Sequence, residues 1–140
     1  MAKRCQVDFY LLGSPELQPE RLACKLALMA WERGHRVSVV SASEAQAGAL
    51  DRLMWAVPEG RFLPHERGTE HPAPVQLLTA PPDEDGDVVI NLTDAPMPGD
   101  LPWRRLLEIV PHRTAEREAS REKFRAYRAQ GLQPKTHDIN

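Results

Sequence analysis

The sequence predicts a single α/β domain in which a mainly parallel central sheet is flanked by helices. Short β-branched or aromatic runs alternate with helical periodicity in the first half of the chain, an order typical of parallel sheets with right-handed crossovers. The 140 residues suffice for one hydrophobic core, so residues 1–140 are expected to form one domain. The 13 prolines and eight glycines gather mostly between the apolar runs, where turns are needed.

The first elements are predicted to be a strand and a helix. Gln6–Leu12 is an apolar run containing Val, Phe and Tyr, and a Gly-Ser-Pro turn follows it. From Pro19 apolar residues recur at helical spacing over about four turns. Gly34 lies just past the end of this pattern, where helices commonly stop.

A second strand and a second helix are predicted next. Residues 36–40 are short and β-branched, as expected of a buried strand. Residues 41–44 have the spacing of a capping box, and apolar residues then recur at helical intervals from Ala45 to Met54. These two elements complete the alternation of strands and helices in the first half of the chain.

The second half contains further apolar runs and one long charged segment. Val75–Leu78 is a short apolar run, and residues 88–92 and 106–110 are expected to be core strands of the same sheet. Residues 114–130 are strongly charged, lack Pro and Gly, and stop at Gly131. This segment is predicted to form the closing helix.

Composition favours a cytoplasmic protein without disulfides or a membrane span. No apolar run approaches the roughly 18 residues of a membrane span, and no apolar stretch of a signal peptide follows the first basic residues. Cys5 and Cys24 form no ligand cluster and are expected to be reduced thiols. The net charge of -2 argues against strong direct binding to nucleic acid. Residues 111–135 nevertheless hold seven basic and three acidic residues, so an acidic partner could dock there.

Neither a cofactor site nor a metal site is predicted. The turn after the first strand has one glycine and neither GxGxxG nor GxxxxGK[ST], so the fold is expected to be Rossmann-like without a nucleotide-binding loop. The five histidines lack the spacing of metal ligands and are interpreted as lone surface residues. The acidic residues 83–87 lack the glutamate that a calcium loop requires. A small nucleotide-dependent α/β enzyme stays open as the alternative function, although no catalytic nucleophile is found.

One face of the predicted closing helix combines arginines with an aromatic ring. Five residues fall within about 100° on a helical wheel: Arg117, Arg121, Phe124, Arg125 and Arg128. Guanidinium groups bind carboxylates bidentately, and an exposed Phe would add an apolar wall for an acidic peptide. The alanines at 115, 119 and 126, with Tyr127, are predicted to be the packing side. The arginines could instead pair with glutamates of the same helix or contact phosphates weakly.

A second candidate surface lies in residues 55–65. Trp55 and Phe62 are large aromatic residues in a segment rich in Pro and Gly, and such residues are good interface anchors. They could equally cap the sheet as a satellite of the core. Trp31 and Trp103 are predicted to serve core packing.

Five segments of the chain have a characteristic order and spacing. They are Phe9-Tyr-Leu-Leu12, Leu22-Ala-Cys-Lys-Leu-Ala through Gly34-His-Arg-Val37, Leu50-Asp-Arg-Leu-Met-Trp-Ala56, Phe62-Leu-Pro-His65 and Arg121-Glu-Lys-Phe-Arg-Ala-Tyr-Arg128. Taken together, they resemble the chi subunit family of DNA polymerase III, and the resemblance extends from Phe9 to Lys135. Residues 72–87 depart from the family pattern.

The resemblance implies a noncatalytic clamp-loader accessory subunit in DNA replication. Such a subunit has no cofactor, and it belongs to a DNA-directed DNA polymerase only as a member of the holoenzyme. Its implied partners are the psi subunit of the clamp loader and the acidic carboxyl-terminal tail of single-stranded DNA-binding protein, which ends in Pro-Phe. A helicase-like protein could instead bind the surface in residues 55–65 that contains Phe62. The implied tail-binding residues are Val110, Arg121, Phe124, Arg125 and Arg128, and the implied psi-binding residues are Trp55, Phe62, Leu63 and Pro64.

Overall fold

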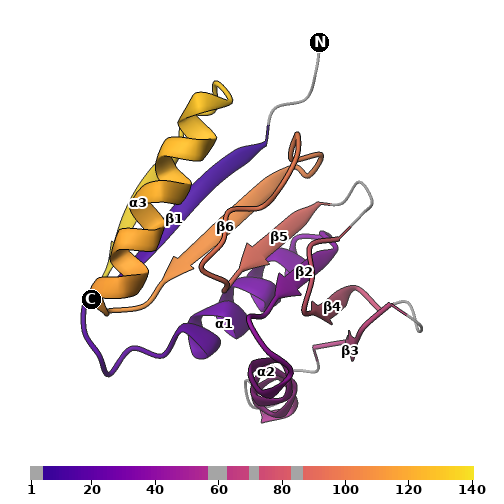
Figure 1. Cartoon of the computed structure of the whole chain (residues 1–140). Coiled ribbons are helices and arrows are strands. Elements are labelled where there is room, and N and C mark those ends of the chain that lie inside the picture. The colour runs from indigo at the N-terminus through magenta and orange to yellow at the C-terminus, as the bar shows by residue number, and fades with distance from the viewer. Residues whose placement is uncertain (1–4, 57–62, 70–72, 83–86) are drawn as a thin grey trace.

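The computed structural model describes residues 5–56, 63–69, 73–82 and 87–140, and within these residues one sheet forms the centre of the molecule (Figure 1). Its strand order is β3-β4-β2-β5-β6-β1-β7, and every neighbouring pair is parallel. The predicted α/β class with a parallel sheet is therefore confirmed. The elements are β1 (Gln6–Leu12), α1 (Pro19–Glu32), β2 (Val37–Val40), α2 (Glu44–Ala56), β3 (His65–Arg67), β4 (Val75–Leu78), β5 (Val88–Asn91), β6 (Arg105–Val110), α3 (Thr114–Ala129) and β7 (Lys135–Ile139).

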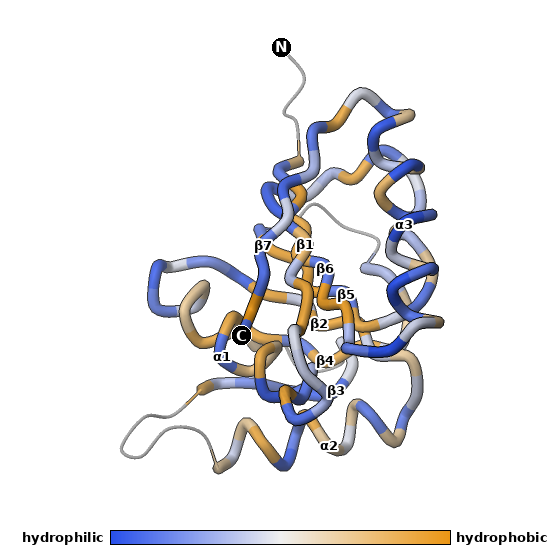
Figure 2. Tube along the Cα trace, turned by 90° about the vertical axis from the view of Figure 1, so that its left-hand side faces the viewer, coloured by the Kyte–Doolittle hydropathy of each residue, from blue (hydrophilic) through white to orange (hydrophobic). Residues whose placement is uncertain are grey.

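The helices cover opposite faces of the sheet. Helices α1 and α2 lie on one face and α3 lies on the other (Figures 1 and 2). Alternate residues of β1 divide between the two layers, with Leu12 in the core beneath α1 and α2 and with Val7 and Phe9 in the core beneath α3. The long crossover from β6 through α3 to β7 carries the chain past β1, because β1 lies between those two strands.

Two short polar strands, β3 and β7, were not predicted from the sequence. They form the two edges of the sheet. Lys135–Ile139 is mostly exposed, and its sequence KTHDI lacks the apolar alternation that identifies a half-buried strand. Polar, short edge strands are common because they limit pairing with other molecules. The predicted strands at residues 6–12, 88–92 and 106–110 are found with boundary differences of one residue at most.

The cap of α2 lies two residues later than predicted. Ser41 directly follows β2, and its N–H donates to the carbonyl of Leu78 at 2.8 Å. The helix is instead capped by Ser43, whose Oγ accepts a hydrogen bond from the N–H of Gln46 at 3.1 Å. The side chain of Gln46 accepts in return from the N–H of Ala42 at 2.8 Å. The cap of α2 therefore uses Ser43 and Gln46, and the donor to the Gln46 side chain is Ala42 and not Ser43.

Among the helices that the structure describes, none combines the length and apolar character needed to cross a membrane.

Candidate functional site

Helix α3 packs on the sheet through a polar stripe. Its buried residues are Ser120, Lys123 and Tyr127. The predicted packing side is only partly correct, because Tyr127 is buried as expected, whereas Ala115 is exposed and Lys123 takes an interior position. A buried lysine needs a counter-charge, and the sheet supplies one.

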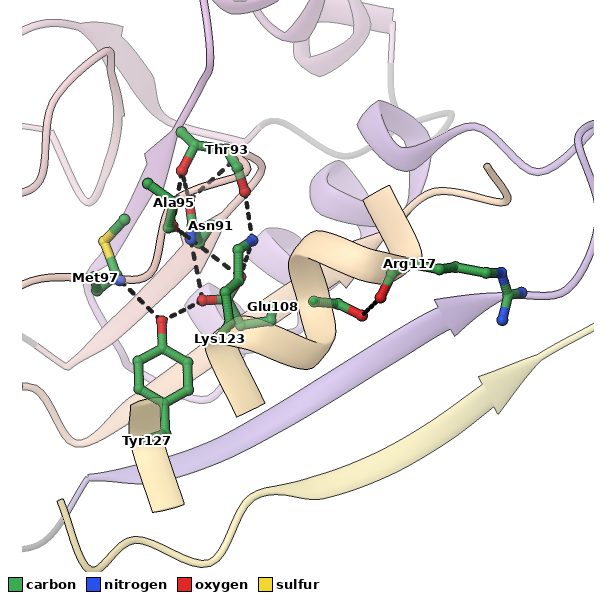
Figure 3. Close-up of polar contacts among 9 residues, drawn as sticks. Asn91, Thr93, Ala95, Met97, Glu108, Arg117, Lys123 and Tyr127 are labelled. Atoms are coloured by element: carbon green, nitrogen blue, oxygen red, sulfur yellow. Dashed lines mark hydrogen bonds and ion pairs between the residues drawn. The ribbon is translucent and has the colours of Figure 1, made fainter. Parts of the chain in front are cut away.

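That counter-charge is Glu108 of β6, which is fully buried (Figure 3). Lys123 Nζ lies 2.9 Å from Glu108 Oε1, and the Tyr127 hydroxyl donates to Oε2 at 2.5 Å. Asn91 Nδ2 donates to both oxygens at 3.0 Å. Burial raises the pKa of Glu108, while Lys123 and the hydrogen bonds act in the opposite direction. Burial, reinforced by Glu108, also raises the pKa of Tyr127.

The same network holds the connection between β5 and β6. Lys123 Nζ also donates to the carbonyl of Thr93, and the Met97 N–H donates to the Tyr127 hydroxyl at 2.9 Å (Figure 3). Asn91 Nδ2 reaches the carbonyl of Ala95 at 2.9 Å. We call Asn91, Glu108, Lys123 and Tyr127 the buried network. This network was not predicted from the sequence, although the glutamate inside the apolar run RLLEIV indicates a buried polar contact.

Beside this network, α3 and the sheet edge enclose a small hollow of about 200 Å³, the α3 hollow. It is bounded by two strands and the helix, so its walls come from three separate parts of the chain. Its lining residues are Phe9, Leu11, Arg117, Ser120, Arg121, Phe124 and Thr136. The hollow therefore has an apolar floor and guanidinium groups in its wall.

Phe124 is less exposed than the sequence analysis expected. Its ring is half-buried and lies 5.4 Å from the ring of Phe9, measured between centroids. Tilted aromatic pairs at this distance stabilise each other beyond the area that they bury. Phe124 thus packs on the sheet and lines the hollow at the same time.

The four predicted arginines have different surroundings. Arg121 lies at the hollow, is exposed, and forms no ion pair with any residue that the structure describes. Arg117 also lines the hollow, and its Nη2 donates to the carbonyl of Leu12 at 3.0 Å. Arg125 is exposed and pairs with Glu122 of the same helix. Arg128 is exposed in the last turn of α3. The hollow therefore brings together Arg117, Arg121 and Phe124, while Arg125 and Arg128 do not line it.

Val110 lies apart from the α3 hollow. Its side chain is 2% exposed and belongs to the core beneath α3. It lines a different hollow of about 470 Å³, near Pro111 and the start of α1. The structure thus brings Val110 close to α3 without placing it beside Arg121.

The predicted second surface is described only in part. Trp55 is 65% exposed at the end of α2, and its ring meets that of His65 edge-on at 5.0 Å between centroids. Leu63 is 1% exposed and belongs to the core beneath α1 and α2. Pro64 is partly buried, and Phe62 lies outside the described residues.

Two histidines are not the lone surface residues that were predicted. The side chain of His65 is 1% exposed, with Nδ1 2.7 Å from the carbonyl of Leu63 and Nε2 2.8 Å from Asp51 Oδ1. His137 of β7 stacks on Tyr10 and lies 2.9 Å from Asp8 Oδ1. Both histidines tie neighbouring elements together. In the part of the chain that the structure describes, no group of His, Cys, Asp and Glu could hold a metal ion.

Asp8 is the centre of a second polar cluster, on the face opposite α3. Arg105 Nη2 donates to Asp8 Oδ2 at 2.8 Å, and His137 meets the other carboxylate oxygen. Burial acts to raise the pKa of Asp8, but the hydrogen bonds with His137 and Arg105 outweigh burial and hold the pKa below its usual value. The cluster joins β1 to both of its neighbouring strands.

The end of β7 closely approaches the glycine that follows β1. The N–H of Gly13 donates to the carbonyl of Ile139 at 2.7 Å. A Cβ on Gly13 would lie 2.8 Å from that carbonyl oxygen and 2.8 Å from the side chain of Asn140. The glycine is needed here because the end of β7 approaches closely, which differs from the way a dinucleotide-binding turn uses its glycines.

The family comparison matches residues 5–135 to "DNA polymerase III chi subunit, HolC". The chain belongs to this family. It is 40% identical over 138 residues to the DNA polymerase III subunit chi of Pseudomonas aeruginosa, and the match covers 96% of each chain. It is 30% identical over 145 residues to the chi subunit of Haemophilus influenzae, covering 99% of each chain. It is 30% identical over 118 residues to that of Escherichia coli, covering 81% of this chain and 80% of the other.

Membership of the chi family makes the chain a component of DNA polymerase III in DNA replication. The family predicted from the sequence is therefore confirmed. β7 extends beyond the matched residues, which end at Lys135.

Proposed function

We propose that this chi-family chain is a noncatalytic bridge within DNA polymerase III. One surface binds the acidic carboxyl-terminal tail of single-stranded DNA-binding protein, and another binds the psi subunit of the clamp loader. The observation that carries the proposal is the α3 hollow, where Arg121 lies beside an apolar floor formed by Phe9 and Phe124.

The chemistry of the α3 hollow suits the end of an acidic peptide. Its volume of about 200 Å³ is below the roughly 300–1,000 Å³ of small-molecule sites, so it fits one side chain better than a cofactor. An aromatic side chain would pack on Phe9 and Phe124, while Arg121 binds the adjacent carboxylate. Arg125 and Arg128 lie further along the exposed side of α3, where acidic residues upstream in the peptide would run.

The psi contact is assigned to the surface around Trp55. A 65% exposed tryptophan is the kind of residue that anchors protein interfaces. Its neighbour His65 is fixed by Asp51 and by the carbonyl of Leu63, so the ring of Trp55 meets a firm support. We propose that Phe62, Leu63 and Pro64 also take part in the psi contact.

The bridge would act by tethering. A weak contact to the tail and a firm contact to psi raise the local concentration of the clamp loader where single-stranded DNA is coated by its binding protein. No covalent step is needed.

Replacing Arg121 with alanine is expected to weaken binding of an acidic peptide ending in Pro-Phe by about 1–3 kcal/mol, because a charge-assisted hydrogen bond is lost. Calorimetric titration of the peptide into each variant measures the change. The exposed Arg33 at the end of α1 offers a matched control, since Arg33→Ala removes the same charge on the other face. Equal affinity of Arg121→Ala and the wild type would remove Arg121 from the site.

Replacing Trp55 with alanine is expected to weaken psi binding by about 2 kcal/mol or more, as for an aromatic side chain that becomes buried when the partner binds. The same variant should bind the tail peptide normally, because Trp55 lies on α2 and the α3 hollow is on the other face of the sheet. Copurification with psi and peptide titration measure the two contacts separately. Loss of both contacts together would indicate misfolding, and retained psi binding would place that interface elsewhere.

A further inference from the structure

Helix α3 packs on the sheet through polar as well as apolar side chains. Of its 16 residues, those that are buried are Ser120, Lys123 and Tyr127, and Phe124 is half-buried. Tyr127 and Phe124 both approach the ring of Phe9, at 6.1 Å and 5.4 Å between centroids. Such a narrow apolar contact fixes the position of a helix only loosely, because apolar attraction has no direction.

The buried network can fix the rotation and height of α3, because hydrogen bonds depend on direction. Lys123 and Tyr127 are four residues apart, so their side chains lie one above the other on one face of α3. They bond to different oxygens of the same carboxylate, Glu108. A slip of one residue along the helix would rotate both side chains by about 100° and break both contacts. One rotation and one height of α3 therefore satisfy the network.

The energetic character of such a network favours a role in positioning. Desolvation of a buried ion pair offsets much of its attraction, so apolar residues of similar shape often stabilise a protein as well or better. Lys123 and Glu108 are 3% and 0% exposed. A network of this kind contributes most by penalising every arrangement in which a member loses its partner.

The orientation of α3 determines where its proposed binding residues, Arg121 and Phe124, point. Phe124 directly follows Lys123 in the sequence, and Arg121 lies two residues before it. Phe124 and Arg121 both line the α3 hollow, together with Phe9 of β1 and Thr136 of β7. Arg117, one turn earlier, points away from the network toward the end of β1 (Figure 3). Displacement of the helix would thus change both the width of the hollow and the direction of its arginines.

We propose that Lys123 is a positioning residue for peptide binding: through its contacts with Glu108 and Thr93 it fixes the rotation and height of α3 that present Arg121 and Phe124 at the α3 hollow. This inference rests on the proposed binding of the acidic tail. Tyr127 has the same role through Glu108 and Met97.

Two variants test the proposal. Lys123→Met keeps the aliphatic stem and removes the ammonium group, and Tyr127→Phe keeps the ring and removes the hydroxyl. Both are expected to bind the acidic peptide ending in Pro-Phe about tenfold more weakly, within the range of couplings carried by packed networks. Val39→Ala is the control, because Val39 is 0% exposed in the core beneath α1 and α2. It should lose stability and keep the wild-type affinity.

Hydrogen exchange gives a readout that overall stability does not mimic. In Lys123→Met the amides of α3 should gain more in exchange rate than those of α1 and α2, whereas Val39→Ala should show no such excess in α3. Wild-type affinity in folded Lys123→Met and Tyr127→Phe would overturn the proposal, and so would an equal loss of affinity in Val39→Ala. If Lys123→Met fails to fold, the peptide affinity of Tyr127→Phe alone tests the proposal. If the wild type itself does not bind the peptide, the proposed tail site fails, and the positioning role fails with it.

Discussion

Replacing Glu108 with alanine is expected to lower the free energy of unfolding by about 3–5 kcal/mol, because the change leaves the ammonium group of Lys123 buried without a counter-charge. Lys123 is 3% exposed and lies 2.9 Å from the carboxylate. The Tyr127 hydroxyl and the Asn91 amide lose an acceptor in the same step. Urea denaturation followed by circular dichroism measures the loss.

A double variant separates loss of the charge pair from loss of packing. Glu108→Gln combined with Lys123→Met removes both charges and keeps similar side-chain volumes, so it should recover most of the lost stability. Glu118→Ala provides the surface control, since Glu118 is an exposed glutamate of α3. A cost below about 1 kcal/mol for Glu108→Ala would show that Lys123 reaches solvent or another acceptor, and would contradict the buried network.

The predictable part of the fold is the part built from apolar residues. β1, β5 and β6 carry buried side chains along most of their lengths, so their sequences alone identify them as strands. β7 is held differently, by backbone pairing with β1 and by contacts of His137 with Tyr10 and Asp8. These partners are more than 120 residues away in the sequence, and local periodicity carries no information about them.

The part of the candidate site that lies within one helix was predictable, and the part contributed by other elements was not. The helical wheel correctly grouped Arg117, Arg121 and Phe124, because that grouping follows from the geometry of one helix. It placed Tyr127 on the packing side but missed Lys123, since a lysine becomes part of a packing surface only when a residue such as Glu108 is opposite. The opposite wall of the hollow comes from β1 and β7, and it requires the sheet order to be known.

Replacing Phe9 with alanine is expected to lower the free energy of unfolding by about 3–5 kcal/mol, as for deletion of a large aromatic side chain from a core. Phe9 is 2% exposed and contacts the rings of both Phe124 and Tyr127. The deletion removes the floor of the α3 hollow, so the remaining folded protein should also bind the acidic peptide more weakly. Thermal or urea denaturation and peptide titration well below the unfolding midpoint give the two quantities.

Leu12→Ala on the same strand distinguishes these two effects. Leu12 is 1% exposed and faces the core beneath α1 and α2, so its deletion should cost about 2–5 kcal/mol. The α3 hollow does not include the Leu12 side chain, and peptide affinity should therefore stay at the wild-type value. Both variants would then lose stability, but only the change on the α3 face of β1 would weaken peptide binding. Equal affinities of Phe9→Ala and Leu12→Ala would instead show that the peptide binds without using the floor of the hollow.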